Sequence, residues 1–499
     1  MNIKIRDFFK NKLWLPPVIL ALLLRIYKLT SSSIWHDEGY TMWLLKYDYF
    51  EIISRTARDV HPPGYYLLTK PWVQIFGTSE FSVRFLSLLF SVGIVFLVYK
   101  IIKDIWSEKA AFWASTFVAL SPFMVRFGQE ARMYGVVAFF TTLATYYFVR
   151  FIKTKNTKYL LFYVPSMLVA MYTQYYAFFV IISHWVILGI FSKGFFELRW
   201  RTTIKEKVSV FSSKWWLANV ALLLGYAPWF PVAYAQVTRV SDSYWIKPEW
   251  ITERTIPGNV LNFAFYNHLD PIYYWSQGLG KFLYWLIALI LILGGVLIFK
   301  NKKRLKTALS LYVFGFLPMV LVFIVSKIAS PIYQDRYFPF SAVAVLAIWG
   351  VTISEIKKKR LRYIFSGLII GILLFGNYLM HKEVNHQMRA LTQVVKLQSQ
   401  EGDLLVSGEL YTHLDGSYYL GYGNLYFMSE PVDGFGETSL YYDQQENYLL
   451  KKPKVTEYKR VWLIGKSGKD YWANEVWDDY QSATYFENAG LRATLYTKN

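Results

Sequence analysis

The chain has 499 residues, of which 54% are hydrophobic and 19% aromatic, and its formal net charge is +20. A soluble protein of this length would normally divide into two or three domains with polar surfaces. Here the apolar residues gather in blocks of about 15 to 22 residues, the length that a helix needs to cross roughly 30 Å of hydrocarbon. The basic excess lies between these blocks, which argues against nucleic-acid binding. Because there is no cysteine, disulfides and thiolate metal sites are excluded.

The apolar blocks predict a mainly α-helical, polytopic transmembrane bundle of about eleven spans. We expect these spans at residues 13–29, 81–101, 110–126, 134–152, 159–173, 175–192, 215–233, 280–299, 307–328, 337–353 and 363–380. The loops that follow the even-numbered spans are rich in Lys and Arg, as in Lys302-Lys303-Arg304, which predicts a cytoplasmic N-terminus and an outward C-terminus. Arg25 and Lys28, near the outer end of the first span, run mildly against this bias, although long basic side chains can snorkel.

The chain is expected to contain two domains. Residues 1–380 would form the transmembrane catalytic domain, and residues 381–499 a small extracytoplasmic α/β domain, since they carry 12 Lys and Arg against 16 Asp and Glu. Residues 384–400 look helical, and short apolar runs at 404–406, 425–428 and 461–464 predict strands. Aromatic and charged residues mix in the first outer loop, residues 31–80, as they do in interfacial helices.

Two motifs in the first outer loop carry candidate chemistry: WHDEG at 35–39 and RDVHPPGYY at 58–66. The carboxylates of Asp37, Glu38 and Asp59 would lie near the membrane surface, where they are costly unless solvated, paired or bound to a cation. A carboxylate there can act as a general base or bind a hard cation. With His61 as a nitrogen ligand, Asp37 and Asp59 are candidate ligands for Mg²⁺ or Mn²⁺. The alternative is an ordinary solvated pair of acids.

Two further outer loops each present an arginine. The sequence QEARMY at 129–134 contains Arg132, and DRYFP at 335–339 contains Arg336. A guanidinium suits a phosphate because of its permanent charge and bidentate geometry. The alternative is an interfacial arginine that contacts lipid headgroups or pairs with Glu130 or Asp335.

These motifs, in this order, resemble the GT-C glycosyltransferases, and specifically the branch that uses polyprenyl-phosphate sugars. That branch includes the protein O-mannosyltransferases and the bacterial lipid A aminoarabinose transferase. The resemblance covers about residues 10–380. It implies an inverting transfer of a sugar from a polyprenyl phosphate to an acceptor hydroxyl outside the cytoplasm.

The resemblance also implies residue roles. Asp37 would be the general base, with Glu38 beside it, and Asp59 the second acid of the loop. The donor phosphate would be bound by Arg132, Arg336, His61 and Tyr337. The surroundings of the sugar and acceptor would include Tyr65, Tyr66, Gln129, Glu130 and Tyr134. The paired prolines are followed by Gly64 and Tyr65, where the protein O-mannosyltransferases have Leu-Gly-Lys, which weakens the case for a protein acceptor.

The expected enzyme lies in a bacterial plasma membrane with its active site outside. Its partners would be a polyprenyl-phosphate sugar and a lipid, polysaccharide or protein acceptor. The competing hypothesis is a flippase or transporter of lipid-linked sugars without catalysis. A transporter should show charged residues along a path in mid-membrane or inverted repeats, whereas the charges here gather at one face.

Overall fold

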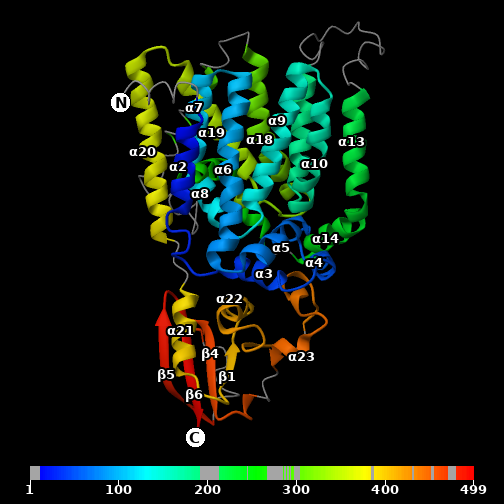
Figure 1. The fold of residues 1–499 in the computed structure, drawn as a ribbon. Helices are drawn as coiled ribbons and strands as arrows, with labels where there is room; N and C mark the ends of the chain where they lie inside the picture. Colours follow the sequence, from blue (N-terminus) through cyan, green and yellow to red (C-terminus); the bar gives the residue numbers. More distant parts are fainter. Residues whose placement is uncertain are drawn as a thin grey trace. The chain divides into compact units, whose positions relative to one another are not determined.

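The computed structural model describes residues 12–191, 213–243, 246–266, 304–383, 387–429, 432–450, 455–469 and 479–499, with isolated residues between 285 and 296. The chain divides into two compact units (Figure 1). The first unit contains Met1–Tyr27 and Arg84–Glu383, and the second contains Lys28–Val83 and Val384–Asn499. The first outer loop, which we expected in the transmembrane domain, is therefore grouped with the C-terminal residues.

The first unit consists of helices, and its long helices run side by side in Figure 1. In chain order they are α2 (Leu15–Ile26), α6 (Glu80–Ile105, whose first turn belongs to the second unit), α7 (Glu108–Leu120), α8 (Pro122–Gln129), α9 (Tyr134–Thr154), α10 (Lys158–Thr173), α11 (Ala177–Phe191), α13 (Ser213–Tyr226), η1 (Ala227–Trp229), α14 (Phe230–Ser243), η2 (Pro248–Trp250), α15 (Thr255–Phe265), α18 (Leu305–Ile328), η4 (Asp335–Tyr337), α19 (Pro339–Glu355) and α20 (Lys359–Glu383).

The mainly helical fold is confirmed, but the predicted count of eleven spans is not reached. Among the described residues, five helices are long and apolar enough to cross a membrane, or six if the bent pair α7–α8 is one span. Four predicted spans coincide with α2, α10, α11 and α19, which have 12, 16, 15 and 17 residues. These are shorter than the roughly 20 residues that a full crossing needs. The predicted span at 280–299 lies outside the described residues, apart from isolated positions.

The bend between α7 and α8, which measures 58°, determines how the first unit supports its third loop. A broken helix leaves backbone carbonyls without partners, and these are costly in apolar surroundings. The buried Arg25 of α2 supplies the missing donors. Its Nη1 donates to Ala119 O at 3.0 Å and its Nη2 to Val118 O at 3.5 Å. Asn377 Nδ2 of α20 donates to Leu120 O at 2.6 Å. Arg25 therefore caps α7 rather than snorkelling.

The second unit combines three helices of the first loop with a six-stranded sheet. Its elements are α3 (His36–Leu44), α4 (Tyr49–Ala57), α5 (Gly64–Phe76), α21 (Met388–Gln398), β1 (Leu404–Ser407), α22 (Leu410–Leu420), β2 (Tyr426–Met428), η5 (Gly436–Leu440), α23 (Gln445–Tyr448), β3 (Leu449–Leu450), β4 (Arg460–Lys466), β5 (Tyr480–Asn488) and β6 (Leu491–Lys498). The predicted helix and the three predicted strands correspond to α21, β1, β2 and β4.

The sheet has the strand order β3-β2-β1-β4-β6-β5, parallel from β3 to β4 and antiparallel from β4 to β5. Its central strand β4 is buried on both faces, as its continuous apolar run requires. Trp462 and Ile464 pack in one core with Met388, Leu391 and Val395, the apolar stripe of the amphipathic helix α21. The alternate residues of β4 pack in a second core on the other face of the sheet, with Leu404 and Val406 of β1.

We predict that replacing Arg25 destabilises the first unit. Arg25→Met leaves the carbonyls of Val118 and Ala119 without these donors, and each such loss costs about 1–3 kcal/mol. The thermal unfolding midpoint of the purified protein should fall by several degrees, and Arg25→Lys should recover only part of the loss because an ammonium lacks the planar fork. The control is Arg254→Met, at a side chain that is 59% exposed. Equal midpoints for Arg25→Met and the control would contradict the capping role.

We also predict that protonation of His413 weakens the second unit. His413 on α22 is buried, with Nδ1 3.0 Å from Tyr441 Oη and Nε2 2.9 Å from Leu425 O, and it packs against Trp43. Burial, with a smaller effect of Lys46, lowers the pKa of His413 to about 4. Because the unfolded chain binds this proton near pH 6.5 and the folded chain does not, the stabilisation is complete above pH 6.5 and is lost as the pH falls toward 4.

The size of this effect is at most about 3 kcal/mol. Hydrogen exchange of peptides from β1 and β4, corrected for its intrinsic pH dependence, should show protection that falls between pH 6.5 and 4. His413→Gln should reduce that slope. If the slope of His413→Gln equals that of the wild type, another group controls the pH dependence.

Candidate functional site

The predicted base and its neighbour lie in the first turn of α3, in the second unit. Trp35 precedes the helix in an extended conformation, and Asp37 and Glu38 follow at the helix N-terminus, where the helix dipole favours negative charge. Asp37 is 9% exposed and Glu38 is fully buried. The alternative of an ordinary solvated pair of acids is therefore wrong. Two buried carboxylates in adjacent positions need neighbouring groups that stabilise them or a substrate that does so.

The second motif of the first loop contributes further buried groups. Asp59 and His61 lie between α4 and α5, and Tyr65 and Tyr66 lie in the first turn of α5. The ring centroid of Tyr66 is 6.1 Å from that of Tyr40, which is one turn beyond Asp37 on α3. The structure therefore brings the two predicted motifs of the first loop together within the second unit, through their aromatic side chains.

The predicted cation ligands do not form a metal site by themselves. In the described part of the chain, no group of three or more His, Cys, Asp or Glu side chains is arranged to hold a metal ion. Asp37, Asp59 and His61 thus do not meet as a set of three ligands. A divalent cation at these residues stays a prediction, and no chemical step is assigned to it.

C-terminal residues contribute groups beside α3 that the sequence did not reveal. His36 Nε2 lies 2.6 Å from Glu437 Oε1 of η5, and the His36 ring packs edge-on against Tyr411 of α22 at 4.1 Å. Burial, followed by the charges of Glu38, Asp37 and Glu437, raises the pKa of Asp415 on α22. We call Asp37, Glu38, Asp415 and Glu437 the acidic group. Asp415 and Glu437 belong to no recognisable motif, and only the tertiary fold places them there.

Further contacts hold the first loop and the C-terminal residues together as one unit. Arg55 of α4 donates to Ser439 O and Leu440 O at 3.2 and 3.0 Å, and to both carboxylate oxygens of Asp443 at 2.9 and 3.0 Å. Tyr47 Oη donates to Leu440 O at 2.8 Å. At the other end of the loop, Arg389 forms an ion pair with Glu80. The surroundings of Asp37 are therefore set by residues almost 400 positions further along the chain.

Three of the predicted phosphate-binding residues, Arg132, Arg336 and Tyr337, lie in the first unit, whereas His61 lies in the second. Gln129, at the end of α8, donates from Nε2 to Arg25 O and Tyr27 O at 3.0 and 2.8 Å, so the α7 cap and the third loop are directly connected. Glu130 is buried and its Oε1 lies 2.6 Å from Arg126 Nη2. Arg132 is also buried. Glu130 therefore pairs with an arginine, as in the alternative given for Arg132, but its partner at 2.6 Å is Arg126.

The third and ninth loops meet in the first unit. The rings of Tyr134 and Tyr337 are 6.1 Å apart. Asp335 accepts the backbone N–H of Arg336 at 2.7 Å and the Nδ2 of Asn262 at 2.8 Å. We call Arg126, Glu130, Arg132, Tyr134, Asp335, Arg336 and Tyr337 the arginine group.

Tyr266 is a member of these surroundings that sequence reasoning missed. Burial is the main cause that raises the pKa of its hydroxyl, with the charges of Arg126, Glu130 and Asp335 acting on it as well. Its ring packs against Phe127 of α8, with centroids 5.6 Å apart.

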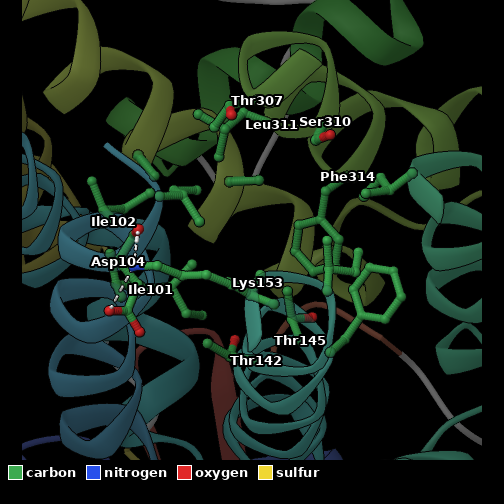
Figure 2. Close-up of a pocket in the computed structure, with 18 of the residues that line it drawn as sticks. Ile101, Ile102, Asp104, Thr142, Thr145, Lys153, Thr307, Ser310, Leu311 and Phe314 are labelled. Carbon is green, nitrogen blue, oxygen red and sulfur yellow. Dashed lines mark hydrogen bonds and ion pairs between the residues drawn. The ribbon is translucent and has the colours of Figure 1, made fainter. Parts of the chain in front are cut away.

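A separate, mostly apolar cavity of about 380 Å³ lies in the first unit among α6, α9, α11, α18 and α19. Figure 2 shows Thr142 and Thr145 of α9 and Phe314 of α18 beside it. Lys153 donates to Asp104 O at 2.8 Å at its edge. Tyr134 and Lys153 are 19 positions apart on α9, or about 28 Å at 1.5 Å per residue. The cavity edge is therefore at the end of α9 remote from the arginine group.

Residues 60–226 match the family model of dolichyl-phosphate-mannose-protein mannosyltransferases. Over 290 residues the chain is 23% identical to YycA of Bacillus subtilis (strain 168), which carries a provisional mannosyltransferase name. This match covers 54% of the chain and 39% of YycA, so the chain spans about two fifths of the length of that curated relative.

Among solved structures, ArnT from Cupriavidus metallidurans in the apo state matches with a TM-score of 0.62 and 11% identity over 97% of both chains. The same protein bound to undecaprenyl phosphate matches with a TM-score of 0.59 and 10% identity. The Archaeoglobus fulgidus oligosaccharyltransferase in complex with Zn and sulfate matches with a TM-score of 0.50 and 13% identity, over 91% of this chain and 68% of that one. The resemblance is therefore confirmed: residues 60–226 are similar to this mannosyltransferase family, and nearly the whole chain shares the fold of ArnT.

Proposed function

We propose that the protein transfers a sugar from a polyprenyl-phosphate donor to an acceptor hydroxyl, with inversion, on the outer face of a bacterial plasma membrane. The observation that carries the proposal is the burial of Asp37 and Glu38 in the first turn of α3, because the sequence resemblance implies the general base at this position. One solved relative of the same fold binds undecaprenyl phosphate, which supports a donor of this class.

The chemistry is a single displacement. The acceptor oxygen attacks the anomeric carbon, the bond from that carbon to the phosphate oxygen breaks, and Asp37 takes the proton of the acceptor hydroxyl. The position of Asp37 suits this role, because at 9% exposure few water molecules compete with the acceptor hydroxyl for its carboxylate. Attack from the face opposite the phosphate gives inversion.

Arg132 and Arg336 would offset the charge that develops on the leaving phosphate. The fixed surroundings of Arg336 support this assignment, because its backbone N–H is bonded to Asp335 and its neighbour Tyr337 packs near Tyr134. The lipid part of the donor would lie among the apolar helices of the first unit, where the cavity offers apolar volume.

We predict that Asp37→Asn lowers the turnover number about 10²–10⁴-fold, since general-base assistance is typically of this size. Donor binding and the unfolding midpoint should change little. The measurement is mass spectrometry of polyprenyl phosphate and glycosylated product after incubation with polyprenyl-phosphate sugars. Asp48→Asn is the matched control, because Asp48 is an exposed residue of the same loop whose capping of α4 an asparagine can reproduce. Turnover of Asp37→Asn at the control rate would refute the assignment.

The same assay separates the alternatives left by the sequence. A flippase would move the donor without releasing polyprenyl phosphate. A dependence on Mg²⁺ or Mn²⁺, expected from the first loop, would appear as loss of turnover in a chelator and its recovery on addition of the ion. Offering lipid, polysaccharide and protein acceptors in parallel would identify the acceptor class.

We predict that Arg336→Lys raises the donor KM roughly tenfold, because the loss of one charge-assisted hydrogen bond costs about 1.5–3 kcal/mol. The acceptor KM should be nearly unchanged. Arg304→Lys is the control, since Arg304 pairs with Glu355 at the opposite end of α18. An unaltered donor KM in Arg336→Lys would place the phosphate elsewhere.

A further inference from the structure

The helix α22 lies unusually close to the turn of α3 that carries the predicted base. A Cβ added to Gly39 would lie 2.8 Å from Asp415 Oδ1, 3.1 Å from Leu414 C and 3.2 Å from Asp415 N. Glycine at position 39 therefore permits the backbone of α22 to approach α3 immediately after Asp37 and Glu38. This approach places the Asp415 carboxylate beside the first turn of α3, within the second unit.

The buried Asp415 carboxylate has no evident role in stabilising the described part of the fold. Asp415 is 9% exposed, and its Oδ1 has no hydrogen-bond partner among the described residues. A buried carboxylate oxygen without a donor is costly, and the like charges of Glu38, Asp37 and Glu437 add to that cost. A bound molecule that donates a hydrogen bond would remove this deficit.

An exposed aromatic ring lies on the same face of α22. Tyr411 precedes Asp415 by four positions, so both side chains project from one side of the helix. Tyr411 is 45% exposed, and its ring contacts His36, which in turn is bonded to Glu437. An aromatic face can cover the apolar face of a sugar ring, and carboxylate oxygens accept strong hydrogen bonds from its hydroxyls.

We propose that Tyr411, Asp415 and Glu437 form a subsite for a neutral, hydroxyl-rich acceptor of the saccharide class. This inference rests on the proposed function and adds the acceptor class to it. The charge of the acidic group disfavours an anionic acceptor. The ammonium group of Lys466 lies 5.1 Å from the centroid of the Tyr411 ring and 3.5 Å from Glu409 Oε2, which offsets its charge. The C-terminal residues would thus select the molecule that Asp37 deprotonates.

Binding can be tested without the donor. The full chain in lipid nanodiscs is mixed with the methyl glycosides of glucose, mannose, galactose and N-acetylglucosamine, and saturation-transfer NMR measures their binding. At least one neutral glycoside should bind, and methyl glucuronide, which carries a carboxylate, should bind at least fivefold more weakly than methyl glucoside. The proposal would be overturned if no saturation transfer to any of the four neutral glycosides is seen, or if methyl glucuronide binds as tightly as methyl glucoside.

Variants of Asp415 and Tyr411 test whether the glycoside binds at this subsite. Asp415→Asn should raise Kd roughly tenfold, the size expected for one hydrogen bond to a charged group. Tyr411→Ala should have a similar effect and Tyr411→Trp should restore binding. Because Tyr411 is exposed, these two variants should fold, which equal unfolding midpoints would verify. Glu401→Gln, at an exposed acid of the same unit, should bind as the wild type does. Unchanged Kd values in Asp415→Asn and Tyr411→Ala would overturn the proposal.

The two proposals fail separately. If polyprenyl phosphate is released from the donor but no glycoside binds, the acceptor subsite is wrong and the proposed function stands. If a glycoside binds through Tyr411 and Asp415 but no donor is ever cleaved, the subsite stands and the transferase function is wrong.

Discussion

A backbone carbonyl without a donor is costly in an apolar interior, and the first unit depends on how this cost is avoided where α7 breaks. Arg25 supplies donors to Ala119 and Val118, and Asn377 supplies one to Leu120. The break allows α8 to leave the direction of α7 by 58°, and the third loop follows from its end. Gln129 then bonds to the carbonyls of Arg25 and Tyr27, so the cap that permits the bend also fixes the start of the loop.

Hydrogen bonds from a buried arginine to backbone carbonyls also hold the second unit together. Arg55 is buried in α4 and satisfies two backbone carbonyls of the C-terminal residues together with the Asp443 carboxylate. A guanidinium can do this because its donors are held in a planar fork, which a lysine lacks. The first loop therefore has no independent fold in this structure. Its acids are presented by helices whose packing depends on η5 and α22.

The helices and several strands could be predicted from the sequence, because they depend on interactions between residues close together in the chain. The apolar blocks marked the helices, and short apolar runs marked β1, β2 and β4, because the periodicity of burial is visible in the sequence. The resemblance implied that Arg132 and Arg336 bind one phosphate, and the rings of Tyr134 and Tyr337 in the same two loops lie 6.1 Å apart. The roles of the individual site residues stay predictions.

What could not be predicted depends on contacts between distant residues. The capping role of Arg25 was not predicted, because a hydropathy pattern contains no information on which carbonyls a break elsewhere would expose. Among the described residues, fewer helices than expected are long enough to cross a membrane, because an apolar block does not reveal where a helix ends and α2 contains only 12 residues. Asp415 and Tyr411 lie in a tyrosine-rich segment without a motif, so only the packing of α22 on Gly39 of α3 gives them significance.

The solved structures of the same fold bear on which residues would select the acceptor. Chains with 10 to 13% identity share this fold, and among them are ArnT and an oligosaccharyltransferase, so the fold alone does not determine an acceptor. If Asp37 is the base, as proposed, the choice of acceptor depends on the side chains near it. In the second unit Asp37 lies in a helix whose neighbours include C-terminal residues, namely acids and an exposed tyrosine. The proposed function therefore predicts that changes in these C-terminal residues alter the acceptor while the displacement at Asp37 is retained.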